Sequence, residues 1–345
     1  MLLEKFRLTI DPPTTYARLR VDQEQCTGCG RCADACPMQI LDIVDGAVRG
    51  NDRYPVFKCI TCQNCVASCS KGAITIEGDY RVHRGFWKNV HLWNGTKTLP
   101  MPPANAASER YEDFRAQLTE TERVILTRRS IRLYRKKAVE ADKLHRIIEA
   151  GRFAPSAGNN QPWKFLVIRN RQVLDETNEV CKKFLRKVSY VAMPHALLDK
   201  RTPGPKDVRY TWWQKIVIPL LSFVRTGEIE PRARGGVNTA SSDPAYHIFF
   251  DAPVLILLLA DRRGIGSVEL DTGICGQNMV LAAHAMGLGT CWVSLAQALN
   301  YDPDYVKKLG IEEPFTVITS ITVGYPAGRI DNVVAREPAR VKWID

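Results

Sequence analysis

Hydrophobic and polar positions predict both helices and strands from residue 122 onward. Between Asp142 and Gly151 the apolar residues recur at i, i+3 and i+4 and a glycine ends the run, which predicts an amphipathic helix. Residues 271–286 are small and apolar on nearly every side, which predicts a buried helix. Apolar runs predict central strands at 165–168, 254–259, 291–293 and 317–323. We therefore expect an α+β domain over residues 122–345.

The N-terminal residues 1–80 follow a different, internally repeated pattern. The segment from Pro37 to Ile43 matches the segment from Ser70 to Ile76, and each predicts a short helix end followed by a strand. Two cysteine runs of the form C-x2-C-x2-C-x3-C precede these segments, and the first run ends in proline. The first run is Cys26, Cys29, Cys32 and Cys36, and the second is Cys59, Cys62, Cys65 and Cys69.

Cysteines at this spacing are typical of a bacterial-type ferredoxin domain with two [4Fe–4S] clusters. Three thiolates at such intervals can surround one corner of an iron–sulfur cube, and the fourth ligand comes from the other run. We expect Cys69 to complete the cluster of the first run and Cys36 to complete that of the second. A pair of zinc sites is the alternative, but zinc knuckles use cysteines in pairs rather than in runs of four.

The other cysteines and the chain's opening residues bear on its location. A short secreted chain with this many cysteines would predict disulfides, but residues 1–10 place charges inside their apolar stretch, unlike a signal peptide. No run of about 18 apolar residues predicts a spanning helix. We expect a reducing, cytoplasmic location, with Cys181, Cys275 and Cys291 as buried free thiols.

Charge and proline content mark two further segments. Residues 81–121 include the proline-rich stretch 99–105 and are expected to be a linker. The formal net charge is +11, and residues 182–235 contain 12 Lys and Arg against 4 Asp and Glu. A basic patch can indicate a nucleic-acid partner. We expect none, because the rest of the chain indicates redox chemistry.

Two motifs of the C-terminal domain suit a phosphate and a planar heterocycle. Arg128, Arg129 and Arg132 with Ser130 offer fixed donors and a hydroxyl to a phosphate, although a solvated basic stretch has the same composition. The loop from Pro155 to Gln161 offers small and amide side chains before a strand, and an ordinary turn is its alternative.

Together with Gly-Leu-Gly-Thr-Cys-Trp at 287–292 and Val-Gly-Tyr-Pro at 323–326, these motifs resemble the nitroreductase family of FMN-dependent oxidoreductases. The resemblance covers residues 122–345 except 182–235. It implies an α+β homodimer with one FMN at each of two sites along the subunit interface. It also implies FMN contacts from Arg128, Arg129, Ser130, Arg132, Pro155, Ser156, Asn159, Gln161, Trp292, Val293 and Ser294. A C-terminal arginine usually joins the phosphate site; we expect Arg336, with Arg329 and Arg340 as competitors.

The combination predicts an iron–sulfur flavoprotein reductase. No Gly-x-Gly-x-x-Gly motif predicts a dinucleotide-binding domain, but members of the family often take hydride from NAD(P)H directly on the flavin. The clusters offer a second entry for electrons, with ferredoxin or flavodoxin as donor, and FMN can join one-electron to two-electron steps. Expected acceptors are nitroaromatics, quinones or activated alkenes. No catalytic side chain is assigned.

Other readings stay open for the substrate and for the basic insertion at 182–235. A reductive dehalogenase-like member would differ in its substrate alone, whereas an electron-transfer or redox-sensing module would dock on a partner enzyme. The insertion is expected to be a lid over the flavin that favours flat and anionic substrates, an arm of the dimer, or a helix on a membrane surface.

Overall fold

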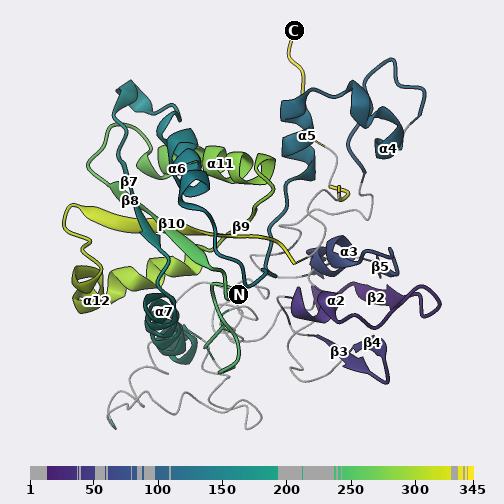
Figure 1. Cartoon of the computed structure of the whole chain (residues 1–345), viewed down its shortest axis with the longest axis horizontal. Helices are drawn as coiled ribbons and strands as arrows, with labels where there is room; N and C mark the ends of the chain where they lie inside the picture. Colours follow the sequence, from purple (N-terminus) through teal and green to yellow (C-terminus); the bar gives the residue numbers. More distant parts are fainter. Residues whose placement is uncertain are drawn as a thin grey trace, which may run out of the picture.

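The computed structural model describes most of the chain outside the basic insertion. The described residues are 14–36, 38, 40–50, 59, 61–78, 80–83, 88, 98–108, 110–192, 212, 237, 240–241, 243–327, 333–336, 339 and 341–345. In Figure 1 the cluster domain lies to one side of a four-stranded sheet that is covered by helices. None of the helices in these described ranges combines the length and the apolar character that a membrane span requires.

The described residues of the N-terminal cluster domain form two short helices and three strand pairs. Helix α2 (Arg31–Asp34) precedes β3 (Leu41–Val44), and α3 (Asn64–Ser68) precedes β5 (Ile74–Glu77), as the repeat predicted. Strand β5 pairs antiparallel with β2 (Arg18–Val21), and β3 pairs with β4 (Ala47–Gly50). Strand β1 (Thr14–Thr15) pairs with β6 (Arg81–Val82), the last strand of the domain. The core between them buries Leu41, Val48 and Ile74 against Cys32 and Cys65.

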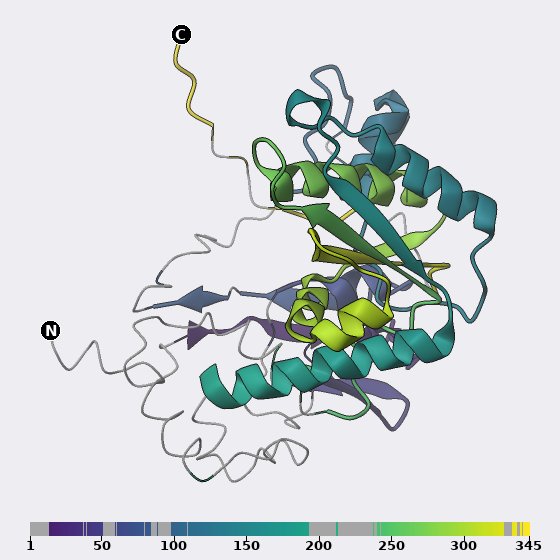
Figure 2. The ribbon, with the colours of Figure 1, turned by 90° about the vertical axis from the view of Figure 1, so that its left-hand side faces the viewer.

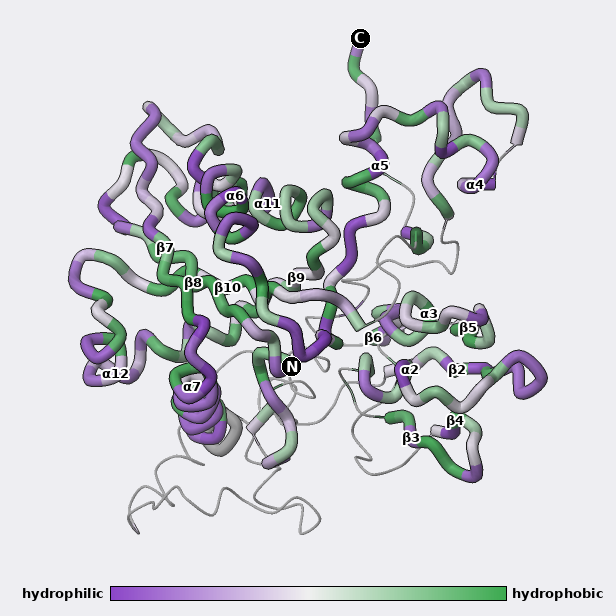
Figure 3. Tube along the Cα trace, in the orientation of Figure 1, coloured by the Kyte–Doolittle hydropathy of each residue, from purple (hydrophilic) through white to green (hydrophobic). Residues whose placement is uncertain are grey.

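The four predicted central strands form one antiparallel sheet. Its order is β7 (Trp163–Ile168), β8 (Val254–Asp261), β10 (Phe315–Gly324) and β9 (Gly289–Trp292). Strand β9 begins earlier than predicted. Strand β8 is buried on both faces, because its successive side chains alternate between two hydrophobic clusters. The buried sheet appears as the hydrophobic centre of Figure 3.

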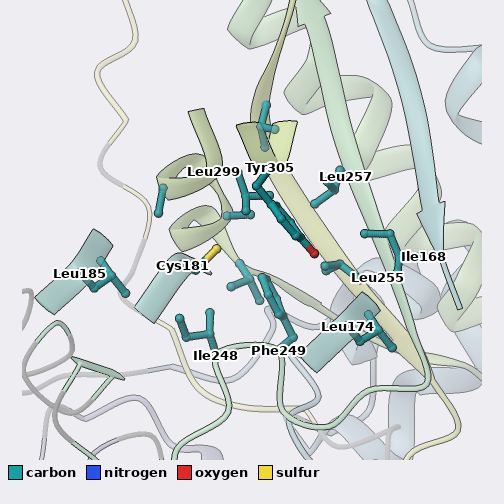
Figure 4. Packing of buried hydrophobic residues seen from close by; sticks show 14 of the residues in the cluster. Ile168, Leu174, Cys181, Leu185, Ile248, Phe249, Leu255, Leu257, Leu299 and Tyr305 are labelled. Atoms are coloured by element: carbon teal, nitrogen blue, oxygen red, sulfur yellow. The ribbon is translucent and has the colours of Figure 1, made fainter. Parts of the chain in front are cut away.

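Helices cover both faces of this sheet (Figures 1 and 2). On one face lie α6 (Ala141–Arg152) and α11 (Val268–Ala285), which pack on Ile256 and Leu258 of β8. On the other lie α7 (Arg171–Ala192), η3 (Ser294–Tyr301) and α12 (Pro303–Lys308), which pack on Leu255 and Leu257. Figure 4 shows this second core, where Cys181 is buried as predicted.

Helix α11 is buried on most of its circumference, as its small and apolar residues predicted. Its Gly276 lets the helix approach β9, because a Cβ there would lie 2.2 Å from the Trp292 ring. Leu270, however, is 60% exposed. Leu270, Ile274 and Leu281 are spaced four and seven residues apart along one side of the helix, and Ile274 and Leu281 are only partly buried. We call Leu270, Ile274 and Leu281 the apolar stripe of α11, which the described residues of one chain cover only in part.

Part of the segment expected to be a linker is folded. It includes α4 (Tyr111–Phe114), η1 (Arg115–Gln117) and the start of α5 (Glu120–Thr127), whose N-terminus carries a capping box between Thr119 and Glu122. Tyr111, Phe114 and Leu118 form a small hydrophobic cluster against Leu126 and Val333.

The buried Lys182, where the basic insertion begins, binds the backbone of residues 243–246, which follow the insertion. Helix α7 continues through residue 182, and its Lys182 is almost fully buried. The Lys182 Nζ donates to the carbonyl oxygens of Asp243, Pro244 and Tyr246 at 2.9, 3.3 and 3.1 Å. Nearly all of residues 193–236 lie outside the described residues. The predictions that the insertion is a lid, a dimer arm or a membrane-surface helix fall on these residues.

Candidate functional site: thiol loops, a cation cluster and a distant amide loop

The structure groups four thiols of the cluster domain around one pocket. Cys26, Cys29 and Cys32 line it together with Cys69, which comes from the other run. Burial raises the pKa of the Cys32 thiol, and the neighbouring thiolates of Cys29 and Cys69 raise it further. Cys69 therefore lies with the first run, which is the crossed arrangement expected from the sequence.

The remaining four thiols form the reciprocal group. Burial is the largest cause that raises the pKa of the Cys65 thiol, and the thiolates of Cys62, Cys36 and Cys59 raise it further. Cys36 thus lies with the second run. We call Cys26, Cys29, Cys32 and Cys69 the first thiol set, and Cys36, Cys59, Cys62 and Cys65 the second thiol set.

The backbone conformation of the two cysteine loops also suits iron–sulfur clusters. Gly28 and Gly30 have φ of 62° and 76°, and the matching positions of the second run, Thr61 and Gln63, have φ of 57° and 60°. Left-handed residues at such intervals turn successive N–H groups to one side, which suits an anionic group. These eight cysteines are thiols rather than disulfides, and the Ala73 N–H donates to the Cys69 Sγ at 3.3 Å. Among the described residues, no three His, Cys, Asp or Glu side chains lie close enough together to bind a single metal ion.

A cation cluster lies at the β9 edge of the sheet. Ser130 forms a parallel bridge to Thr290 of β9, and the Ile131 N–H donates to the Thr290 carbonyl at 2.8 Å. This pairing fixes the Arg128–Arg132 segment along the edge strand. Arg336 lies close enough to lower the pKa values of Arg128 and Arg129, and its own backbone pairs with Thr98 through hydrogen bonds of 2.9 and 2.8 Å.

The charges in this cluster are not compensated. Burial and, to a smaller extent, the neighbouring guanidinium groups of Arg336 and Arg128 lower the pKa of Arg129 to about 10. The Arg129 Nη1 is buried without a hydrogen-bond partner among the described residues. Within the same residues no Asp or Glu forms an ion pair with Arg128, Arg129 or Arg336. Buried like charges with an orphaned donor fit a bound anion such as a phosphate.

The amide loop, residues 155–161, has a well-defined conformation. The Gln161 N–H donates to the Ser156 Oγ at 2.9 Å, and the Gln161 Nε2 donates to the Asn159 Oδ1 at 3.2 Å. Asn159 and Gln161 are exposed, with φ of 54° and 46°. The loop is held to α11 because the Ala157 N–H donates to the Asp271 Oδ2 at 3.2 Å. Its amides are therefore presented to the outside of the domain.

One chain does not bring the amide loop and the cation cluster together. The loop leads into Trp163, which pairs with Ala260 and through it neighbours Thr316 of β10. Ser130 instead neighbours Thr290, which pairs with Val323 of β10. These two points of β10 are roughly 23 Å apart at about 3.3 Å per residue.

The third segment predicted to contact FMN, residues 292–294, lies between the amide loop and the cation cluster along β10. Trp292 ends β9, the Val293 N–H donates to the Ser320 carbonyl at 2.9 Å, and Ser294 is exposed at the start of η3. The Cys291 thiol beside this segment is buried and interacts with the Ser130 side chain.

A large cavity separates the cation cluster's side of the sheet from the cluster domain. Its volume is about 1340 Å³, and its walls come from residues 33–36 and 41–42 on one side and 132–139 and 243–254 on the other. Tyr246 and Phe250 line it, and sequence reasoning missed both, because no motif marks them. Their position depends on the chain returning to the sheet after the insertion.

Comparison with known proteins assigns both domains. The family described as "Nitroreductase family" matches residues 125–325. The chain belongs to the nitroreductase family. A 4Fe-4S dicluster domain matches residues 18–70. This membership confirms the predicted α+β fold class and the assignment to an oxidoreductase family.

Relatives of the chain include reductases. A putative NADH dehydrogenase/NAD(P)H nitroreductase of Archaeoglobus fulgidus is 23% identical over 61% of this chain and 87% of its own length. A 4-nitrobenzoate reductase of a Nocardioides species is 28% identical over 62% of this chain and 85% of its own. A solved nitroreductase with bound FMN from Bacteroides fragilis is 24% identical, with a TM-score of 0.45, and covers 66% of this chain and 100% of its own.

Proposed function

We propose that this nitroreductase-family protein is an iron–sulfur flavoprotein that holds two [4Fe–4S] clusters and one FMN per chain. The single observation that carries the proposal is the uncompensated cation cluster on the edge strand, next to a domain with two grouped sets of thiols. When bound, the clusters supply single electrons and FMN supplies a hydride to an electron-poor acceptor.

The residues of this chain divide the flavin site into two halves. Arg128, Arg129 and Arg336 hold the phosphate, because they offer several charge-assisted donors in one place. Ser130 and Arg132 continue this half toward the ribityl chain. Asn159 and Gln161, with Pro155 and Ser156, offer amide and hydroxyl groups to the ring system from the other half. The backbone of residues 292–294 lies between these halves on β9 and η3. No side chain is assigned as a proton donor.

A homodimer is needed to complete this site. The two halves lie at opposite ends of β10 in one chain, so we infer that the amide loop of one protomer serves the cation cluster of the other. Large apolar side chains are exposed beside the loop: Phe153 at 71%, Ile265 at 63% and Leu270 at 60%. Residues 341–345 also extend away from the rest of the chain in Figures 1 and 2, with Trp343 82% exposed. A second copy would cover the apolar stripe of α11.

Mixed dimers test this arrangement. One chain carries Arg129→Leu and the other carries Asn159→Gly with Gln161→Gly, since glycine accepts the positive φ of both positions. Each parent homodimer has two damaged sites. If the halves come from different chains, the mixed dimer has one intact site and one site with both defects, so it binds about half of the normal FMN tightly. A mixed dimer without tight FMN binding would show that both halves belong to one chain.

The acceptor is proposed to be a small electron-poor molecule such as a nitroaromatic, quinone or activated alkene. The relatedness to 4-nitrobenzoate reductases supports a nitroaromatic. NAD(P)H, ferredoxin and flavodoxin are the proposed donors. Turnover of 4-nitrobenzoate by the anaerobically purified protein, with each donor in turn, tests the activity. Absence of turnover with all acceptor classes, in a protein that holds both cofactors, would contradict it.

The cofactor content tests the binding part separately. Anaerobically purified protein is expected to contain about eight irons, about eight sulfides and about one FMN per chain. A colourless, zinc-loaded protein would refute the two-cluster assignment.

A further inference from the structure

The two thiol sets differ in what surrounds them. The pocket of the first thiol set is lined only by residues 25–74 of the cluster domain, among them Arg31 and Lys71. A member of the second set, Cys36, instead lines the large cavity between the domains. The opposite wall of that cavity contains Arg132 and Tyr246. Among the described residues, it is therefore the second set that shares a cavity with the surroundings of the proposed flavin site.

The flavin-domain side of this contact is a packed group of three residues. The Arg132 guanidinium lies 5.6 Å from the centroid of the Phe250 ring, and Phe250 meets Tyr246 edge to face at a centroid distance of 6.4 Å. Cys36 lies on the cavity wall facing this group. The cavity thus brings a thiol of the second set opposite an arginine of the predicted flavin site.

The charges agree with this geometry. The thiolate of Cys62 lies within electrostatic range of Arg129 and Arg132, and the thiolate of Cys36 lies within range of Tyr246. The described partners of Cys32 in the first set are Cys29, Cys69 and its own loop. Arg129 and Arg132 thus face the phosphate half of the flavin site and the second thiol set at once.

We propose that the second thiol set, Cys36, Cys59, Cys62 and Cys65, holds an inner cluster next to the flavin, and that Arg129 and Arg132 are positioning residues shared by both cofactors. The first thiol set then holds an outer cluster, separated from the flavin by the inner one. This inference rests on the proposed function, because it requires both cofactors to be present in one chain.

The shared arginines predict an electrostatic signature that does not depend on turnover. A [4Fe–4S] cluster gains a negative charge on reduction, so a nearby cation raises its midpoint potential and its removal lowers that potential. A bound FMN phosphate would offset the positive charge of Arg129 and Arg132. FMN binding should therefore lower the potential of the inner cluster and leave the outer cluster unchanged.

Potentiometric titration of the full chain, followed by EPR of the two cluster signals, tests the assignment. Arg132→Gln should lower the midpoint potential of one signal, and the matched variant Arg31→Gln should lower that of the other. Removing FMN from the wild-type protein should raise the potential of the signal that Arg132→Gln moves. Cys36→Ser should change the line shape of that same signal.

Three results would overturn the inference. The first is that FMN removal shifts the midpoint potential of the signal that Arg31→Gln moves. The second is that FMN removal shifts the potentials of both signals equally. The third is that Arg132→Gln changes the potential of neither signal. If Cys36→Ser fails to assemble, the two arginine variants still assign the signals. Failure of the proposed function itself is seen earlier and separately, as missing iron or missing flavin before any titration.

Discussion

Replacing Arg129 with leucine should weaken FMN binding while leaving the flavin-free protein as stable as before or more stable. Arg129 is 8% exposed, lies beside two other guanidinium groups and has a buried Nη1 without a described partner. A native pKa of about 10, against 12.5 for a free arginine, corresponds to about 3 kcal/mol of unfavourable energy for its charge. Leucine removes that cost and keeps apolar contacts.

The flavin-bound protein should respond in the opposite direction. A charge-assisted hydrogen bond is worth about 1.5–3 kcal/mol, so losing one to the phosphate raises the dissociation constant for FMN by roughly 10- to 150-fold. Titration of flavin-free protein with FMN measures the binding change, and chemical denaturation of the flavin-free protein measures stability. Since the pKa of Arg129 is lowered, its charge is unfavourable in the fold at neutral pH, and this penalty fades as the pH rises through about 10.

A fall of about 2 kcal/mol or more in the stability of the flavin-free variant, with unchanged FMN affinity, would refute the reasoning. It would mean that Arg129 supports the fold through groups of the chain itself. Arg152→Leu is the matched control, because Arg152 is an exposed arginine of α6 whose partner is Glu149. This control should change neither quantity appreciably.

Three further variants test separate parts of the account. Leu270→Glu places a charge on the apolar stripe of α11 and should convert dimers to monomers in sedimentation, with loss of tightly bound FMN. Lys182→Met leaves three carbonyl oxygens at the neck of the insertion without their shared donor and should lower the unfolding free energy by about 2–4 kcal/mol, whereas exposed Lys183→Met should not. Gly28→Ala should halve the iron content, because a Cβ in this first thiol loop would lie 2.0 Å from the backbone oxygen of Gly46 in the turn between β3 and β4. Gly72→Ala, also at positive φ but in open space, should keep all the iron.

Each variant has an outcome that contradicts its premise. A fully dimeric, flavin-bound Leu270→Glu protein would place the interface elsewhere. Equal stability of the two lysine variants would remove the structural role of Lys182. Equal iron in the two glycine variants would show that the first thiol loop tolerates a side chain at Gly28.

The two cofactor motifs were predictable from the sequence because their chemistry depends on local spacing. The cysteine runs and the Arg128–Arg132 segment each lie within a few residues of chain. The sheet was predictable as well, since β8 is a long apolar run and β10 is rich in the β-branched residues Val, Ile and Thr. Helix α11 shows the limit of this reasoning, because its all-round apolar pattern does not separate burial within one chain from burial against a second.

Other parts of the site depend on contacts between distant segments. Spacing along the chain does not single out Arg336 among the three C-terminal arginines, because its place near Arg129 depends on how residues 333–336 return to the sheet, where Arg336 pairs with Thr98. Tyr246 and Phe250 carry no motif and reach the cavity through the turn that Lys182 holds. The folded part of the linker arises because Phe114 and its neighbours meet Val333 from the end of the chain.

The number of electrons that the protein accepts tests the central claim most directly. Anaerobic titration with dithionite, followed by the flavin and cluster absorbance, counts them for the purified chain. Two one-electron clusters and one two-electron flavin predict about four reducing equivalents per chain. An uptake of about two equivalents, accounted for by the flavin alone, would contradict the account.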